Sequence, residues 1–239
     1  MTSQILINEQ LKKEREEHKK EINHWHPSKL GSCLTGMYLE RLDLPPDKDF
    51  DERTLRVFAV GHIFEKWYLD TVEKSGAVVD RQIALEWPEF DVRGALDAEI
   101  DGLPHELKSK HSRGFWHMIR EGGASRHHMM QLWTYLKMRD KKEGRLIYIS
   151  KDDLGIQEYV VLLNDESLEK EVTNELEILN KAWKEKVAPA IEFNEDDWRA
   201  KYCRWHLQCL KYESTSTMSG LWESNSPKVG SITEDRKAV

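Results

Sequence analysis

Apolar residues recur at helical intervals along several parts of this chain. Between 53 and 74 they return every three or four positions and Gly76 then supplies a stop signal, which predicts an amphipathic helix. The segments 126–139 and 165–186 are also predicted to be helices. A run of charges of alternating sign from Glu9 to Glu21 predicts a further helix, exposed to solvent.

Strands are predicted between these helices, where apolar and polar residues alternate. Val78 to Glu86 is the first, and the segments 145–150 and 157–163 form a later pair joined by an Asp-Asp-Leu-Gly turn. Between them, the segment 92–109 is predicted to be a β-hairpin that turns at Asp101-Gly102. This order of elements predicts an α/β fold with a mixed central β-sheet flanked by helices.

The predicted hairpin carries the most informative chemistry of the chain. Side chains two residues apart share one face of a strand, so Glu106 and Lys108 are expected to point the same way while Leu107 points into the core. Asp97 lies on the partner strand and can approach Glu106 if the register permits. Two carboxylates and one ammonium group would then converge.

Two carboxylates a few ångströms apart repel one another unless a cation lies between them. Oxygen ligands with water positions left over suit Mg²⁺ or Mn²⁺. Such an ion can polarise a phosphoryl oxygen and lower the pKa of a bound water, which Lys108 would orient, so phosphodiester hydrolysis is predicted. The alternative is a surface hairpin with an ordinary Glu106–Lys108 ion pair, in a chain that has 43 acidic residues.

Further motifs surround the hairpin in a characteristic order. They are His26-Pro27-Ser28-Lys29-Leu30, Cys33 ahead of Tyr38-Leu39, Gly61-His62 with Glu65, Gly94-Ala95-Leu96-Asp97, Glu106-Leu107-Lys108, and Gln131-Leu132-Trp133-Thr134-Tyr135. From about Trp25 to about Tyr212 the chain resembles the PD-(D/E)XK nuclease superfamily, in the branch of the RecB-type nuclease domains and the CRISPR-adaptation exonucleases. The resemblance implies a restriction-endonuclease-like core, here with helical additions at both ends.

The resemblance also implies a metal site. His62, Asp97 and Glu106 would be side-chain ligands of the metal, the carbonyl of Leu107 would be a further ligand, and Lys108 would position the attacking water. The plainer alternative for His62 is a histidine on a helix surface, because the chain has 10 histidines.

DNA is the partner that the resemblance implies. Gln131 and Tyr135 lie four residues apart on one helix face and would flank the site and contact DNA; the alternative is a half-buried helix face. A net charge of −7 argues against nucleic acid if it is spread evenly, but the window 108–139 is locally basic and includes Lys110 and Arg113. A basic channel beside the site is therefore predicted.

Side chains other than lysine and arginine are also expected to serve that channel. His111, His117, His127 and His128 would add positive charge to it below neutral pH. Aromatic faces can stack on unpaired bases, and Phe115-Trp116, which follows the basic stretch, is the pair predicted to do so.

Three cysteines form a second candidate metal site. In the CRISPR-adaptation branch four cysteines hold an iron–sulfur cluster; Cys33, Cys203 and Cys209 match three of them, and Ala200 stands at the fourth position. A [4Fe–4S] cluster takes four thiolates, so several alternatives stay open. They are a cluster with another ligand or with three irons, a zinc site of the three cysteines and His206, and a site without metal.

Length and composition predict one principal domain. With 239 residues the chain has room for a single core, and it contains neither an apolar run of membrane-spanning length nor a signal-peptide pattern. A cytoplasmic protein is expected, in the host cytoplasm if phage-encoded. The predicted parts are a charged helical arm (1–24), a nuclease domain (25–212) and a disordered polar tail (213–239).

These expectations combine into a metal-dependent deoxyribonuclease, an exonuclease on single-stranded or frayed DNA that serves replication, recombination or repair. Its preference for ends is implied by the resemblance. No glycine-rich phosphate loop is present, so unwinding would need a helicase or recombination partner. Two rival hypotheses are a non-catalytic DNA-binding or assembly subunit that keeps the nuclease fold, and an interaction protein that depends on a metal cluster at the cysteines.

Overall fold

The computed structural model describes residues 2–17, 23–190, 197, 200 and 202–213. The helices are α1 (Ser3–Glu17), α2 (Leu34–Arg41), α3 (Glu52–Lys74), α4 (Ser112–Glu121), α5 (Arg126–Arg139), α6 (Glu166–Glu185) and α8 (His206–Glu213). The strands are β1 (Val79–Trp87), β2 (Val92–Ile100), β3 (Leu103–Lys110), β4 (Glu143–Ser150) and β5 (Ile156–Leu162). Glu213 ends α8, and the rest of the segment predicted as a disordered tail lies outside the described residues.

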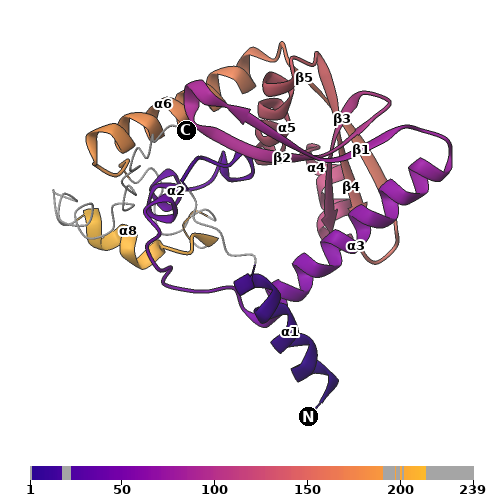
Figure 1. Cartoon of the computed structure of the whole chain (residues 1–239), viewed down its shortest axis with the longest axis horizontal. Helices are drawn as coiled ribbons and strands as arrows, with labels where there is room; N and C mark the ends of the chain where they lie inside the picture. The colour runs from indigo at the N-terminus through magenta and orange to yellow at the C-terminus, as the bar shows by residue number, and fades with distance from the viewer. Residues whose placement is uncertain (1, 18–22, 191–196, 198–199, 201, 214–239) are drawn as a thin grey trace, which may run out of the picture.

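The strands form one sheet in the order β1-β2-β3-β4-β5. Neighbouring strands are antiparallel except for β3 and β4, which are parallel. A parallel pair needs a long crossover connection, and α4 and α5 supply it (Figure 1). The predicted α/β fold with a mixed central sheet is confirmed.

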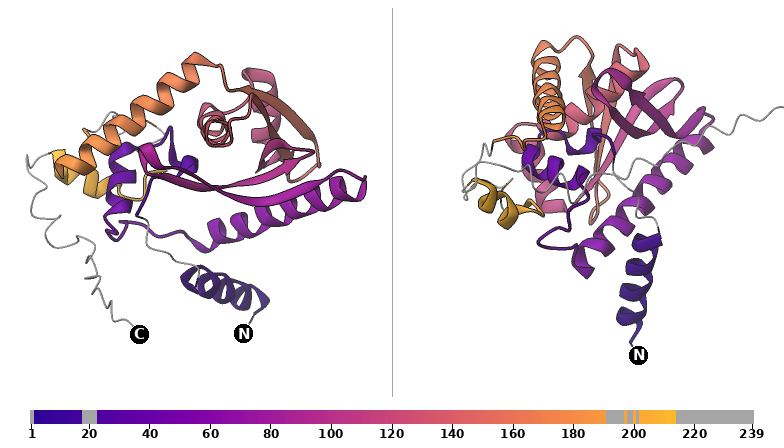
Figure 2. Two further views of the ribbon diagram at one scale, coloured as in Figure 1. Left: turned by 45° about the horizontal axis from the view of Figure 1, so that its top comes forward. Right: turned by 60° about the vertical axis from the view of Figure 1, so that its left-hand side comes forward.

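Two hydrophobic cores lie on opposite faces of this sheet, as the side chains of β4 show. Leu146 and Tyr148 join the larger core with α2, α5 and α6, whereas Ile147 and Ile149 join the smaller core with α3. Successive strand residues point to opposite faces, so the sheet lies between helical layers, with α5 and α6 on one side and α3 on the other (Figure 2, left). The seven residues 130–136 of α5 are all buried, which makes α5 the central helix of the larger core.

Side chains of β2 that should share one face of the hairpin of β1 and β2 join different hydrophobic cores. Leu96 belongs to the larger core and Ala98 to the smaller one, although residues two apart in a regular strand share a face. The irregularity lies at Gln82, whose backbone is left-handed with φ of 49°. The register leaves out the pair of Gln82 with Asp97, so Asp97 stands where the strand is distorted.

A buried segment that the apolar pattern did not predict precedes α3. Helix α2 packs on α6 and is buried at seven of its eight residues. Trp25, just before it, donates from Nε1 to Oδ1 of Asn180 on α6 at 2.6 Å. The guanidinium of Arg41 lies 4.3 Å from the ring centroid of Trp25 and 4.2 Å from that of Trp183. These contacts fix the segment that carries Cys33.

Helix α1 packs against α3 through polar contacts. Asn8, which is buried, and Lys12 both contact the Glu52 carboxylate, Lys12 at 2.9 Å. Arg15 pairs with Asp49 at 2.6 Å. The predicted exposed helix is therefore tied to the fold along one side. It begins earlier than the charge pattern indicated, and residues 18–22, the last part of that pattern, lie outside the described residues.

Candidate active site and metal centre

The first candidate site lies at a fork between β2 and β3. These strands pair only from Ala98↔His105 to Ile100↔Leu103. The next step of that register would place Asp97 opposite Glu106, but the strands separate there, and Oδ2 of Asp97 accepts the backbone N–H of Leu107 at 2.8 Å. A side-chain carboxylate thus replaces the ladder bond.

Glu106 and Lys108 point the same way from β3, as their spacing predicted. Nζ of Lys108 lies 2.6 Å from Oε1 of Glu106. The Glu106 side chain is 1% exposed. Its Oε1 also accepts a hydrogen bond from Nε2 of Gln131 on α5, at 2.7 Å. Oε2 of Glu106 is buried and has no hydrogen-bond partner among the described residues. A buried carboxylate oxygen in this state is suited to a cation.

The electrostatics of the fork also favour a cation. Burial raises the pKa of Asp97 well above its ordinary value, and the charge of Glu106 raises it further. Burial likewise raises the pKa of Glu106, against the influence of Lys108. Burial lowers the pKa of Lys108, but Glu106 and Asp97 outweigh it and the net shift is upward. One ammonium group therefore does not offset two buried carboxylates, and a divalent ion would.

Helix α3 brings two further polar side chains to the fork. His62 is 82% exposed, with Nδ1 3.7 Å from Oε2 of Glu65. Glu65 is 21% exposed, and its charge raises the pKa of both Asp97 and Glu106. It is held by Gln82, whose Nε2 donates to Oε1 at 2.7 Å. Glu65 was part of the Gly-His motif but was not predicted as a site residue. Its position one helical turn after His62 could have indicated that both side chains face the same site.

His62 and the fork share one cavity of about 490 Å³ between α3 and the sheet. The sheet side consists of Asp97, Leu107, Lys108, Ser109, Ile149 and Lys151, and the α3 side of Val57, Phe58, Gly61, His62, Phe64 and Glu65. No third carboxylate or imidazole of the described residues lies near enough to Asp97 and Glu106 to form a preassembled three-ligand group. His62 borders the site at its mouth.

Gln131 and Tyr135 are placed differently from the prediction. Gln131 is 4% exposed and Tyr135 is fully buried, whereas a DNA contact requires an accessible side chain. A Cβ on Gly94 would lie 2.8 Å from the Tyr135 hydroxyl, so glycine makes room for this ring beneath β2. Both side chains lie behind Glu106, and Gln131 holds it.

The predicted basic channel is only partly accessible. Arg113 is exposed, and Lys110 is half-buried with Nζ 5.5 Å from the centroid of the Tyr148 ring. Burial lowers the pKa of His128 to about 2 and also lowers that of His127. The prediction of added charge below neutral pH was therefore wrong for His128, because burial keeps it neutral, whereas His111 and His117 are exposed.

The two residues predicted to stack on bases, Phe115 and Trp116, differ in their exposure to solvent. Phe115 is 1% exposed and belongs to the larger core, so the prediction of base stacking was wrong for this residue. Trp116 is 45% exposed, but its Nε1 donates to Asp153 at 2.6 Å. The helix that carries both residues packs on β4, which puts one aromatic inside and the next one outside.

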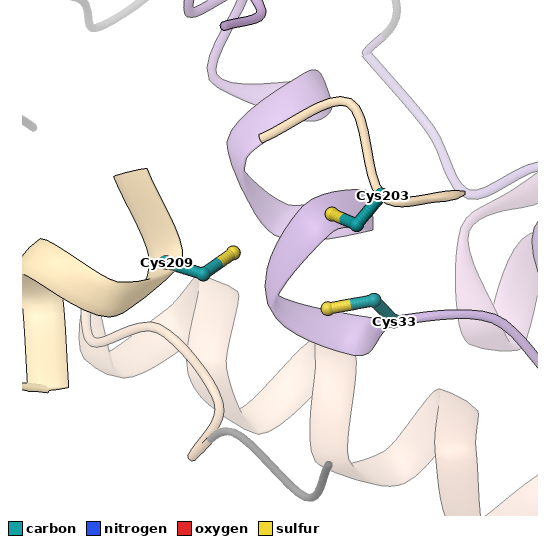
Figure 3. Close-up of side chains that lie close together, drawn as sticks. All are labelled: Cys33, Cys203 and Cys209. Atoms are coloured by element: carbon teal, nitrogen blue, oxygen red, sulfur yellow. The ribbon is translucent and has the colours of Figure 1, made fainter. Parts of the chain in front are cut away.

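The three cysteines meet at a second site, where Cys33 at the start of α2 faces Cys203, just before α8, and Cys209 on α8 (Figure 3). The sulfurs of Cys33, Cys203 and Cys209 all lie within 4.8 Å of one another, and none forms a disulfide. A Cβ on Gly36 would lie 2.9 Å from Sγ of Cys203, so only glycine allows this approach. Ala200, which precedes Cys203 and Cys209 in the sequence, is buried.

The donor set of this thiol site fits a metal. Hydrogen bonds from Cys203 and Cys209, together with the N–H of Gly36, lower the pKa of Cys33 to about 3, while the contacts with the other two sulfurs raise that of Cys209. Two thiolates on one zinc ion lie about 3.8 Å apart, given bonds of about 2.3 Å, so the sulfurs are close enough to share an ion. His206 is not part of the group; the predicted completion of a zinc site by this residue is not preformed.

No family model and no curated protein matches this sequence. Solved structures do match. The crystal structure of SSO0001 aligns with a TM-score of 0.56 at 19% identity, over 87% of this chain and 96% of that one. An alkaline exonuclease, LHK-Exo from Laribacter hongkongensis, aligns with a TM-score of 0.51 at 13% identity, over 70% and 94% of the two chains. This chain shares their fold. The complex of LHK-Exo with dAMP aligns similarly, with a TM-score of 0.52 at 12% identity, over 70% and 90%.

Proposed function

We propose that this chain is a metal-dependent deoxyribonuclease that hydrolyses phosphodiester bonds as an exonuclease on single-stranded or frayed DNA. The observation that carries the proposal is the fork, where Asp97 and Glu106 enter from separate strands and Lys108 lies 2.6 Å from Glu106. The fold shared with an alkaline exonuclease supports it, as does the dAMP bound to that enzyme in one structure.

Asp97 and Glu106 would hold Mg²⁺ or Mn²⁺, with the Leu107 carbonyl and His62 as further ligands. Carboxylate oxygens are the ligands that these ions prefer, and Oε2 of Glu106 is buried without a partner among the described residues. Glu65 faces the same charges and would complete the site beside His62. When bound, the ion supplies polarisation of a phosphoryl oxygen and a lowered pKa for water.

Lys108 would orient the attacking water and stabilise the negative charge that develops on the phosphoryl oxygens. Its raised pKa keeps it an ammonium group. Gln131 would hold Glu106 through Oε1, and we assign Gln131 and Tyr135 this supporting role in place of the predicted contact with DNA. Lys110 and Arg113 are the proposed contacts with DNA phosphates.

The test is cleavage of end-labelled single-stranded and duplex DNA in Mg²⁺, Mn²⁺ or chelator. Asp97→Ala should abolish cleavage, and Lys108→Ala should slow it by about 10²–10³-fold. Asp80→Ala and Lys142→Ala, which change exposed charges of the same types outside the fork, should cut like the wild type. The product ladder gives the polarity. A wild-type chain that binds DNA in these ions without ever cutting it would refute the nuclease and favour the non-catalytic subunit.

We also propose that Cys33, Cys203 and Cys209 bind a metal through three thiolates. The proximity of the sulfurs and the thiolate favoured at Cys33 support it. Elemental analysis of protein purified without oxygen should find iron with acid-labile sulfide and visible absorbance if an iron–sulfur cluster is held, or about one zinc per chain if a single ion is held. Cys33→Ser should lower either content, and a wild-type chain without metal would overturn the proposal.

Any partner that unwinds duplex DNA, such as a helicase or recombination protein, would act beside this chain. Among the described residues no helix is both long and apolar enough to cross a membrane.

A further inference from the structure

We infer that Phe58 is the base-stacking residue of the cavity, and that it selects strands with unpaired bases. The inference rests on the proposed nuclease function and concerns the wall opposite the fork. Nothing in the sequence motifs pointed to Phe58, because it belongs to the apolar pattern that predicts α3 as an amphipathic helix.

The cavity has two chemically different walls. Asp97 and Lys108 lie on the sheet side, whereas α3 contributes the apolar side chains Val57, Phe58 and Phe64 beside the polar His62 and Glu65. Phe58 is 47% exposed and Val57 is 42% exposed. Large apolar side chains facing a polar catalytic cavity are costly unless a ligand covers them. A nucleotide presents both chemistries, a phosphate for the fork and an aromatic base for α3.

Phe58 is held in place by a second aromatic residue. The ring centroid of Phe50 lies 5.1 Å from that of Phe58, with the rings at 86° to one another. Phe50 in turn is contacted by two guanidinium groups, that of Arg15 at 4.7 Å from its centroid and that of Arg204 at 4.3 Å. Cation–π contacts of this kind fix a ring. The support leaves Phe58 with little freedom while nearly half of its surface stays open.

A rigid exposed aromatic beside a phosphate site favours unpaired bases. Every base has a π-face, so stacking tolerates any sequence, and a base inside a duplex has both faces covered by its neighbours. A strand whose terminal base is unstacked can place that base on Phe58 and the adjacent phosphate at the fork. The cavity volume of about 490 Å³ lies within the range of small-molecule sites.

The experiment measures binding and cleavage separately. Single-stranded oligonucleotides with 2-aminopurine near either end are titrated with protein in Ca²⁺, and stacking is read from fluorescence quenching. Phe58→Ala should lose the quenching and weaken binding by about 10-fold or more, and Phe58→Trp should restore both. Trp67→Ala is the matched control, because Trp67 is a comparably exposed aromatic of α3, at 43%, that does not line the cavity.

Cleavage in Mn²⁺ then separates this inference from the proposed function. Phe58→Ala should raise KM for a normal strand and leave the rate on a strand with abasic ends close to that of the wild type. If wild-type and Phe58→Ala chains cut and quench alike, the stacking role is refuted while the nuclease stands. If neither chain cuts but quenching depends on Phe58, the nuclease is refuted while the base site stands.

Discussion

Asp97 and Glu106 are two acids buried together, and their pKa values are both raised. A carboxyl group whose pKa is raised in the folded protein stabilises the fold at pH values below its ordinary pKa, which is 3.8 for Asp97 and 4.5 for Glu106. This stabilisation is lost as the pH rises through the raised pKa of the folded protein. Without metal, therefore, the fork opposes folding near neutral pH. With metal, the same charges become ligands.

Replacement of Asp97 by Asn tests this. In EDTA, the free energy of unfolding should be higher for Asp97→Asn than for the wild type at pH 8. This difference between the two proteins should be smaller at pH 5, because the variant has no proton to release at this site as the pH rises. Excess Mn²⁺ at about 100 times its dissociation constant should stabilise the wild type by about 2.7 kcal/mol and the variant by less. Urea denaturation at the two pH values is the measurement. An equal difference at pH 5 and pH 8 would show that Asp97 has an ordinary pKa.

Gly36 is the residue that lets Cys203 approach α2. Its replacement by Ala adds a Cβ 2.9 Å from Sγ of Cys203. Metal content at the thiol site should fall below half, although alanine favours a helix over glycine by about 0.5–1 kcal/mol. Gly114→Ala on α4, where a Cβ meets nothing within 4 Å, is the control. Metal analysis together with a thermal melt separates a lost site from a lost fold, and unchanged metal content in Gly36→Ala would contradict the expected clash.

At the scale of elements, the change of face in the β1–β2 hairpin depends on the left-handed backbone of Gln82. Gln82→Val should destabilise the protein by about 1–2 kcal/mol, because a β-branched residue is disfavoured at positive φ. Gln82→Gly should keep or slightly raise stability, but should reduce nuclease activity, because Glu65 loses its hydrogen bond. Ala84→Val, two residues on and also exposed, is the control. Equal stability of the two valine variants would mean that Gln82 is not strained.

Most helices and strands could be predicted from the local periodicity of apolar and polar residues, among them the strands of the sheet, α3, α5 and α6. The shared direction of Glu106 and Lys108 followed from the two-residue period of a strand, whereas the approach of Asp97 depended on the register, which the sequence left open. Helix α2 could not be found in this way, because it is buried almost all round and carries no amphipathic pattern. Burial of α5 goes further than the half-buried face that was the alternative for Gln131 and Tyr135, since residues 130–136 are all buried, and the supporting position of Gln131 was not predicted.

At the scale of the whole molecule, α1 supports the cavity from outside the core. Deletion of residues 2–17 removes Arg15 from Phe50 and the contacts of Asn8 and Lys12 with Glu52. The sheet and both hydrophobic cores should survive, since neither core includes an α1 residue. Single-strand binding should weaken at least about 3-fold through a less rigid Phe58, measured by anisotropy beside a circular-dichroism melt. Loss of the cooperative melt would instead make α1 part of the folding unit.

The thiol site joins parts of the chain that are synthesised far apart in time. Cys33 leaves the ribosome before any strand of the sheet, and Cys209 follows after α6. The fork of Asp97 and Glu106 can therefore form during translation while the thiol site is still incomplete. Metal at the cysteines would report that synthesis has passed residue 209, and a product truncated earlier would retain the carboxylate fork without that mark of completion.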